Sequence, residues 1–411
     1  MARELPDWLS GYLEFSKNTE SPLSYHTWAG VSCITSALQR RVFMQWGHEK
    51  IRANMYVVLV GPSGQTRKGT PIGIARDLLT EVGIKMASNA GSRQSLISYM
   101  GDSLDSYTDP DSGELIYHCS VTCISEEMSV FLGQQDIERL ADLTDLYDAK
   151  DEWSYSTRKH GIESVRGVCV NMLAGTAATW LPSILPQEAI GGGFTSRLIF
   201  VVEQYKGQIV SDPNSVPPDK DLREKLIHDL REIINLSGEF TFDKAALGEY
   251  KAWYERQERN IKAGAPAIAD PRFSGYMARR ASHIKKLAMI LSASRGDDRI
   301  VGVEDFKRAQ LILETAEKKM PGAFKGLGSA RFAVVTENIL DFINGRGKVK
   351  RSQVLQLFWR DCDAWTMDQV EAVLSRMKAI KISLIPGLDD KEYESLAADV
   401  IDRHGKLKSD S

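Results

Sequence analysis

The stretch from Met55 to Thr70 constrains the fold of this chain more than any other. An apolar, β-branched run at 56–60 ends in the loop GPSGQTRKGT at 61–70, and an amphipathic helical pattern follows from Gly69 to Val82. This order predicts a buried strand, a phosphate-binding loop and a helix. Glycines let backbone N–H groups face an anion, and the N-terminus of a helix favours negative charge. Pro71 fits the first helical turn, where its missing N–H costs nothing.

The loop departs from the pattern G-x-x-x-x-G-K-[ST] in its register. Six residues rather than five separate Gly61 from Lys68, Arg67 stands at the second glycine, and Gly69 precedes Thr70. We expect the loop to bind the phosphates of ATP, with Lys68 on the terminal phosphates and Thr70 on Mg²⁺. The residues expected to line the nucleotide are Gly61, Pro62, Ser63, Gly64, Gln65, Thr66, Arg67, Lys68, Gly69 and Thr70. The competing interpretation is a strand and a helix joined by a polar turn.

Two acids follow the next strongly apolar strand. The pattern at 115–125 predicts this strand, and Glu126 and Glu127 come directly after it. In a P-loop ATPase, one carboxylate at such a place holds the Mg²⁺ shell and its neighbour polarises the attacking water. We therefore assign Glu126 to the metal and Glu127 to the water. An acidic helix cap is the ordinary alternative at a strand end.

Two later strands carry further candidates for catalysis. The strand predicted at 168–176 contains Asn171 and ends in Thr176, and either side chain could sense the γ-phosphate or orient the water. The glycines at 191–193 lead through Arg197 into a strand at 198–202. Arg197 could reach the γ-phosphate of an adjacent subunit, because guanidinium donors match developing phosphoryl charge. A structural salt bridge would explain Arg197 equally well.

A basic hairpin is predicted between these strands. The segment at 152–162 alternates and turns, with an aromatic arm and a basic tip. In a ring-shaped motor it would face the central channel and follow a phosphate backbone. The residues expected on DNA are Tyr155, Arg158, Lys159 and His160. An ordinary exposed hairpin fits the pattern equally well.

The second half of the chain reads as mostly helical. We divide the whole chain into a helical lead-in at 1–50, an ATPase core at 51–210, a helical lid at 219–320, a winged-helix domain at 330–390 and a polar tail at 403–411. In the lid, Arg280 could contact phosphate, although a solvated basic face is the ordinary explanation. In the winged helix, DNA would meet Lys348, Lys350 and Arg351, and protein docking competes with that role.

Composition excludes several other classes of protein. Of the 411 residues 43% are apolar, and the formal net charge is −3, so any surface for nucleic acid must be local. The five cysteines have no C-x-x-C spacing and are expected to be reduced and buried. The N-terminus has no signal-peptide pattern and no apolar run has membrane-spanning length. We expect a cytoplasmic protein without membrane contact, in the host cytoplasm if a phage encodes it.

Several motifs in this order resemble a known family. They are Arg40-Arg41-Val42, GPSGQTRKGT at 61–70, the pair Glu126-Glu127, LAGT at 173–176 and GGGFTSRLIF at 191–200. Over residues 6–320 they resemble the primase-associated, helicase-like P-loop ATPases of phages, prophages and plasmids, and ring ATPases more broadly. The resemblance implies an α/β fold with a RecA/AAA+-like parallel sheet, ATP hydrolysis with Mg²⁺, and a hexameric homo-oligomer. It also implies a replicative helicase on single-stranded or forked DNA, with a primase or another replication protein as partner.

Two other functions stay open at this point. The first is an ATP-gated helicase loader or replication initiator that binds DNA or a partner without unwinding. The second is a nucleotide kinase, because Lys68-Gly69-Thr70 resembles the Lys-Gly-Thr of adenylate-kinase loops.

Overall fold

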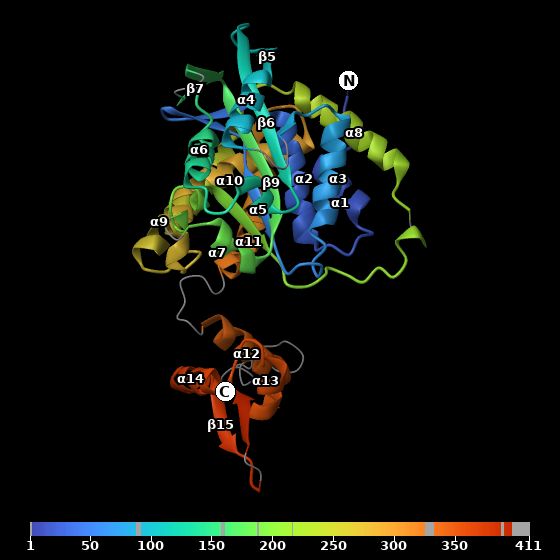
Figure 1. Cartoon of the computed structure of the whole chain (residues 1–411). Helices are drawn as coiled ribbons and strands as arrows, with labels where there is room; N and C mark the ends of the chain where they lie inside the picture. The colour runs from blue at the N-terminus through green and yellow to red at the C-terminus, as the bar shows by residue number, and fades with distance from the viewer. Residues whose placement is uncertain are drawn as a thin grey trace. The chain divides into compact units, whose positions relative to one another are not determined.

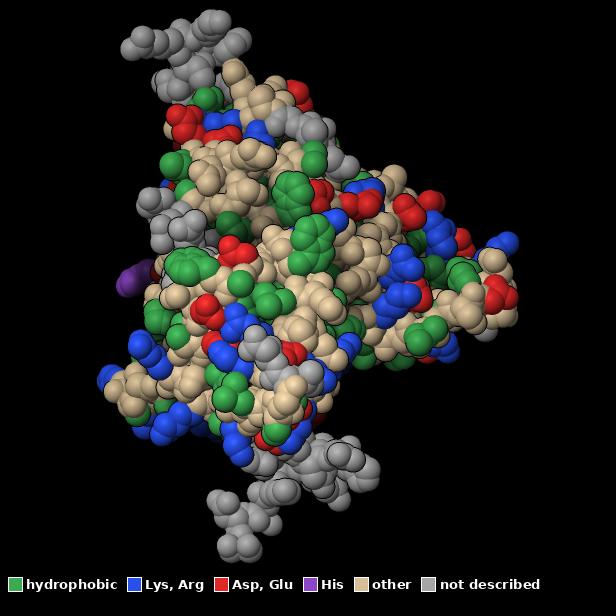
Figure 2. Space-filling view, turned by 60° about the horizontal axis from the view of Figure 1, so that its bottom comes forward, with side chains coloured by type: hydrophobic (Ala, Val, Ile, Leu, Met, Phe, Trp, Pro, Cys, Tyr) green, Lys and Arg blue, Asp and Glu red, His purple; other side chains and the backbone are tan. Residues whose placement is uncertain are grey.

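The computed structural model describes residues 2–87, 92–157, 161–186, 189–215, 217–324, 333–387 and 390–396. The chain divides into two units, Met1–Phe324 and Lys325–Ser411 (Figure 1). Within the described residues, no helix combines the length and the apolarity needed to cross a bilayer. Basic, acidic and apolar side chains are interspersed over the face shown in Figure 2, in keeping with the small net charge.

A mostly parallel sheet forms the centre of the first unit. Its strand order is β10-β3-β9-β6-β4, all parallel, and β5 pairs with β6 in the antiparallel sense. Every residue of β3, β9 and β10 is buried, as expected for parallel strands that are covered on both faces. The predicted α/β class is therefore confirmed. The strands are β3 (Tyr56–Val60), β4 (Met86–Ala87), β5 (Leu104–Thr108), β6 (Leu115–Ser125), β9 (Val168–Thr176) and β10 (Leu198–Val202).

Helices cover both faces of this sheet. Thr35 of α2 donates to Asn171 of β9 on one face, whereas Tyr56 of β3 donates to the carbonyl of Leu143 in α6 on the other. Helices α1 and α3 pack against α2 on the first face (Figure 1). The helices around the sheet are α1 (Trp8–Ser16), α2 (Leu23–Leu38), α3 (Gly69–Glu81), α4 (Arg93–Asp102), α5 (Met128–Leu132), α6 (Ile137–Tyr147) and α7 (Leu181–Ile184).

The helices expected to form a lid belong to the body of the first unit. Helix α10 contacts α2, α11 and the short helix at Thr195–Arg197, and its residues 283–294 are all buried. A helix that is buried all round is a core element. The four helices are α8 (Lys220–Asn235), α9 (Lys244–Lys262), α10 (Ser274–Arg295) and α11 (Val303–Glu317).

Smaller sheets of two or three strands lie outside the main sheet in the described part of the first unit. The first sheet has the order β11-β1-β2, a second pairs β12 with β13, and β7 and β8 form the predicted hairpin. Their bounds are β1 (Val42–Trp46), β2 (Glu49–Arg52), β7 (Glu152–Thr157), β8 (Gly161–Arg166), β11 (Gly238–Glu239), β12 (Thr241–Phe242) and β13 (Ile300–Val301).

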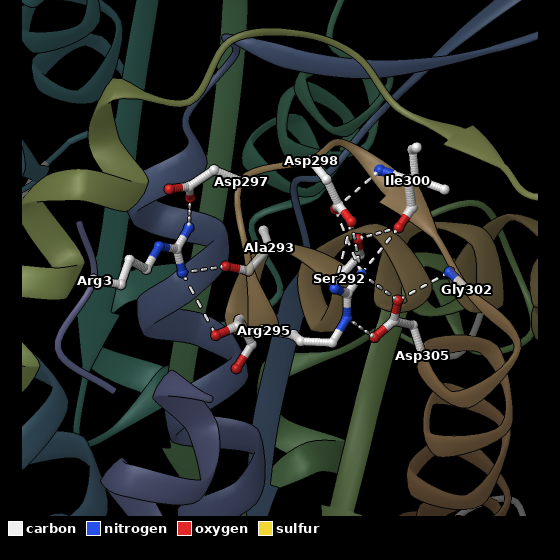
Figure 3. A network of polar contacts seen from close by, with 10 residues as sticks. Arg3, Ser292, Ala293, Arg295, Asp297, Asp298, Ile300, Gly302 and Asp305 are labelled. Carbon is white, nitrogen blue, oxygen red and sulfur yellow. Dashed lines mark hydrogen bonds and ion pairs between the residues drawn. The ribbon is translucent and has the colours of Figure 1, made fainter. Parts of the chain in front are cut away.

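Polar contacts at the end of α10 fix the N-terminal segment and the turn into α11 (Figure 3). Arg3 forms an ion pair with Asp297 and donates to the carbonyl of Ala293. On the other side, Arg295 contacts both carboxylate oxygens of Asp305 at 3.1 Å, and Asp305 accepts the N–H of Gly302 at 2.9 Å. The expected lead-in is thus bound directly to the helices after residue 219.

The second unit has a core of its own. Three helices enclose a three-stranded antiparallel sheet of order β14-β16-β15, around a core that includes Ile339, Met367 and Tyr393. The elements are α12 (Ala333–Arg346), β14 (Lys348–Lys350), α13 (Arg351–Leu357), α14 (Ala364–Arg376), β15 (Ile380–Leu384) and β16 (Lys391–Ser395). The predicted tail at 403–411 lies outside the described residues.

Candidate functional site

The loop after β3 is built around a glycine that no other residue could replace. A Cβ on Gly61 would lie 2.5 Å from the hydroxyl of Tyr25, 2.6 Å from that of Thr66 and 2.7 Å from the carbonyl of Glu203. Gly61 also donates its N–H to the carbonyl of Thr176 at 3.1 Å, which fixes the start of the loop on β9. The loop therefore leaves the sheet in one defined direction.

The side chain of Lys68 folds back onto the first two residues of the loop. Its amine donates to the carbonyls of Gly61 at 2.6 Å and Pro62 at 3.3 Å. Burial lowers the pKa of this amine, and the nearby carboxylate of Glu127 acts in the opposite direction. Lys68 is also the N-cap of α3, and no side chain caps that helix. In the first turn of α3, Thr70 donates its N–H to the carbonyl of Arg67 at 3.1 Å and Pro71 has none, so the N–H of Gly69 is the group that this turn offers beside the lysine.

Arg67 takes the backbone conformation that a glycine would take. Its φ is +53°, in the left-handed region that non-glycine residues rarely adopt. Its guanidinium pairs with Glu20 at 2.9 Å, and its carbonyl accepts the hydroxyl of Ser21 at 2.7 Å. The segment before α2 therefore holds the loop in the altered register.

The two predicted acids lie at the start of α3 and beside β9. A Cβ on Gly69 would be 3.3 Å from Oε2 of Glu126, and Arg76 of α3 pairs with Oε1 of Glu126 at 3.0 Å. Glu127 accepts the hydroxyl of Thr176 at 3.5 Å. Because β9 lies between β3 and β6, its last residue stands between the loop and the acids.

These residues meet at the carboxyl edge of the parallel sheet, where ligands bind in open α/β sheets. Gly61, Lys68, Gly69, Glu126, Glu127 and Thr176 form the assembled set. The helix N-terminus without a side-chain cap and the lysine amine fit a phosphate chain. Exposed Thr70 and Glu126 supply oxygen atoms of the kind that Mg²⁺ takes.

Asn171 does not belong to this set, contrary to the sequence prediction. It lies in the middle of β9, and its side-chain oxygen accepts the N–H of Met55 at 3.0 Å and the hydroxyl of Thr35 at 3.1 Å. Met55 precedes β3, whereas the loop follows β3, so Asn171 faces the opposite end of the strand. It satisfies buried polar groups between α2 and the sheet.

Arg197 has a partner within its own chain. It is buried, pairs with Asp148 at 2.6 Å and donates to the carbonyl of Gly193 at 2.7 Å. It precedes β10, at the end of the sheet away from the loop. Of the two interpretations, this placement corresponds to the structural salt bridge, and a trans-acting arginine finger would require Arg197 to leave its buried pair.

Arg280 lies among helices rather than at the loop. It is buried, and its guanidinium bonds to Glu317 at 2.7 Å and to Gln257 at 3.1 Å. It therefore ties α10 to α11 and α9. Neither phosphate contact nor a solvated basic face describes this residue.

The expected DNA contacts are only partly described. Tyr155 stacks on Trp153, and the guanidinium of Arg93 lies 4.6 Å from the centre of the Tyr155 ring. Arg158, Lys159 and His160 lie outside the described residues.

In the second unit, the basic residues expected on DNA are largely engaged with neighbouring acids. Lys348 pairs with Glu394 at 3.0 Å, and Arg351 pairs with Asp368 at 2.8 Å and Glu371 at 3.0 Å. Arg351 thus ties α13 to α14. Lys350 is exposed, and its backbone N–H donates to the side chain of Gln353.

Sequence reasoning missed the residues that brace the loop. Tyr25 donates to the carbonyl of Val60 at 2.7 Å, and Glu20 joins Arg67 to Lys206. Arg76 was also missed, although it lies two helical turns after Gly69 and so on the same face of α3. No local signal in the sequence marks Tyr25, since its partner lies far along the chain.

Comparison of the sequence with protein-family models and with curated proteins finds no match. The site is therefore interpreted from its own geometry.

Proposed function

We propose that this chain is an ATP-hydrolysing motor of RecA/AAA+ type that acts on DNA, as the replicative helicase of a phage or another mobile element. What supports this most directly is the convergence of the Lys68 amine, the Glu127 carboxylate and the Thr176 hydroxyl at one edge of a parallel sheet. An uncapped helix N-terminus lies at the same place. This is the set of groups that phosphoryl transfer to water requires.

The roles of the residues follow from their positions. The backbone N–H of Gly69 at the start of α3 would contact the phosphates, and Lys68 would turn from the loop carbonyls to neutralise the charge of the β- and γ-phosphates. Glu127 would orient the attacking water, held in place through Thr176. Thr70 and Glu126 would hold Mg²⁺, which supplies Lewis-acid stabilisation of phosphate charge when bound. For Glu126 this requires release from Arg76.

The part of the proposal that concerns DNA rests on the family resemblance and on two elements. The first is the β7–β8 hairpin, with Tyr155 half-exposed on its arm. The second is the C-terminal unit, whose order of helix, strand, two helices and an antiparallel strand pair supports a winged helix. We propose a hexameric ring, with a residue other than Arg197 completing each neighbouring site.

Measurement of ATP hydrolysis with and without single-stranded DNA, together with strand displacement on a fork, tests the proposal. Wild-type protein should hydrolyse ATP faster with DNA and displace the strand. Glu127→Gln should bind ATP but not turn it over, whereas Glu138→Gln, an exposed acid on α6, should behave as wild type. Absence of ATP binding by the wild type, or turnover by Glu127→Gln at the wild-type rate, would refute the assignment.

A helicase loader is the second candidate, and the surface of the C-terminal unit favours it. Exposed apolar side chains on this unit include Leu357, Trp359, Trp365 and Met377. Exposed aromatic and Met residues beside engaged basic residues are more typical of protein docking than of phosphate contact. A loader would hydrolyse ATP in the same assay without displacing the strand.

A further inference from the structure

A polar cavity lies at the opposite end of β3 from the loop at 61–70. Its volume is about 410 Å³, and β2, the segment around Tyr147 and α10 enclose it. Asn54, which lines it, comes just before β3, whereas the loop follows that strand. The charged residues around it are Glu49, Lys50, Arg52, Asp148, Arg279 and Lys286.

The deepest cation of this cavity, Lys286, bonds to neutral oxygens in the part of the chain that the structure describes. Lys286 is buried, and its amine donates to the backbone and side-chain oxygens of Asn54, each at 2.9 Å. The amine also lies 3.8 Å from the centre of the Tyr147 ring. Among the described residues, no carboxylate forms an ion pair with it. Burial lowers the pKa of Lys286 to about 7.

Arg52 is a second buried cation in the same wall. Its Nη1 donates to the carbonyl of Arg40 at 2.7 Å, while its Nε is buried without a hydrogen-bond partner. No described carboxylate pairs with it, and a guanidinium keeps its charge at any physiological pH. An unpaired buried charge is costly, and a bound anion would compensate it.

Two carboxylates line the cavity, those of Asp148 and Glu49, and they do not neutralise its positive charge. Asp148 is shared between Arg197 at 2.6 Å and Arg279 at 3.5 Å. Glu49 lies on the exposed rim. The cavity therefore presents Lys50 and Arg279 at its mouth and Arg52 and Lys286 in its depth.

A second cavity adjoins the first one, between the β1–β2 hairpin, α9 and α10. Trp46 of β1, Tyr250 and Tyr254 of α9, and Lys285 of α10 line this second cavity of about 330 Å³. The amine of Lys285 lies 4.2 Å from the centre of the Trp46 ring, and Tyr254 is exposed. Tyr250 and Lys285 are buried and Trp46 is half-buried, so Tyr254 is the ring that this cavity presents to a ligand. An exposed ring beside a basic cavity can stack on a base of single-stranded nucleic acid.

We infer that the cavity between β2 and α10 binds a phosphate group, and that this phosphate belongs to a nucleic-acid strand lying across β1, β2 and α10. The site is separate from the loop at Gly61 and does not depend on ATP hydrolysis. A free phosphate or nucleotide offers the same chemistry, and the experiment below distinguishes the two sources.

Carbamylation of Lys286 by cyanate, followed by peptide mass spectrometry on the full chain, reports directly on the cavity. The neutral amine adds to the carbon of cyanic acid, a proton moves to the cyanate nitrogen, and nothing leaves. Pyrophosphate should slow this reaction roughly tenfold, because a nearby anion raises the pKa of an amine by about one unit or more. The protection should persist in Lys68→Ala protein, which separates it from binding at the loop.

The double variant Lys50→Gln, Arg279→Gln removes both cations from the mouth without touching the buried residues. It should fold with an unchanged melting temperature, but pyrophosphate should no longer slow the carbamylation of its Lys286. Lys307→Gln, an exposed lysine on α11 that lines neither cavity, should keep it. Protection that survives in the double variant, or that disappears in Lys68→Ala, would overturn the assignment.

Two ligands separate the sources of the phosphate. Protection by both oligodeoxythymidylate and pyrophosphate supports a nucleic-acid strand. Protection by pyrophosphate alone overturns the nucleic-acid source and keeps a site for a free phosphate group. Protection by neither ligand overturns the site itself.

Discussion

Gly61 shows how a single position can decide whether the loop forms. Any side chain there would collide with a backbone carbonyl and two hydroxyls, and the backbone atom cannot turn away. Gly73, on the following helix, has nothing within 4 Å of the place of a Cβ. The two glycines therefore form a matched pair for substitution: packing requires a glycine at Gly61, whereas a larger side chain has room at Gly73.

We predict opposite effects of alanine at these glycines. Gly61→Ala should lower the free energy of unfolding by about 1–3 kcal/mol through overpacking and abolish ATP binding. Gly73→Ala should raise it by about 0.5–1 kcal/mol, because alanine is the better helix former. Urea denaturation and nucleotide titration measure both. A stable, ATP-binding Gly61→Ala protein would contradict the loop geometry.

Lys286 predicts a pH dependence of stability. Its pKa is about 7 in the folded chain against an ordinary 10.5, since burial disfavours the charged amine. The groups that face it are Cys169, Asp148, Arg197 and Arg279. Between these two pKa values the unfolded chain binds more protons, so stability should rise with pH across this window.

The comparison with Lys286→Met isolates this effect. The free energy of unfolding of wild type minus that of Lys286→Met should increase from about pH 7 to pH 10. Lys307→Met, at an exposed lysine, should show no such slope. A flat difference for Lys286→Met would mean that the amine is not buried as described.

At the scale of elements, the apolar runs were sufficient to predict the main strands. The patterns at 56–60, 115–125, 168–176 and 198–202 all form strands of one sheet, because buried parallel strands are continuous apolar runs. Helix α10 is different: a solvated basic face is the ordinary explanation for Arg280 in its sequence, yet Arg280, Lys285 and Lys286 are all buried. Only distant partners such as Glu317 and Asn54 make their burial possible, and no local pattern shows these partners.

Arg197 connects the turn before β10 to the end of α6. Arg197→Ala should destabilise the chain by about 1–3 kcal/mol, because it removes a buried guanidinium from half-exposed Asp148. Arg259→Ala breaks an exposed pair on α9 and should cost at most about 0.5 kcal/mol. Thermal and urea unfolding measure the difference.

Subunit mixing tests the alternative role of Arg197. We expect no recovery of ATP turnover when Arg197→Ala and Glu127→Gln proteins are combined. Recovery in the mixture, with Arg197→Ala as stable as wild type, would instead place Arg197 in a neighbouring site.

At the scale of the whole molecule, the two units should separate. Each has its own hydrophobic core, and the boundary lies after Phe324. Deletion of residues 325–411 should leave basal ATP turnover within about twofold of wild type while weakening the binding of DNA or of a protein partner. Loss of basal turnover in a folded truncated protein would show that the C-terminal unit takes part in hydrolysis.

The sequence indicated which residues meet at the sheet edge better than it indicated the residues around them. Lys68, Glu126, Glu127 and Thr176 meet because strand ends share an edge, which periodicity alone implies. The partners of Asn171 and Arg197 depend on side-chain contacts between segments more than forty residues apart. Such contacts are decided by packing, and a single sequence does not contain them.

The ion pairs behind the loop connect it to segments far along the chain. Arg67 is joined to Glu20, Glu20 to Lys206, and Glu203, just after β10, to Lys319 at 2.6 Å. Lys319 lies five positions before the end of the first unit. The pairs at Glu20 and at Glu203 are joined by the backbone between Glu203 and Lys206, so a nucleotide that displaced Arg67 would act on the segment that follows β10.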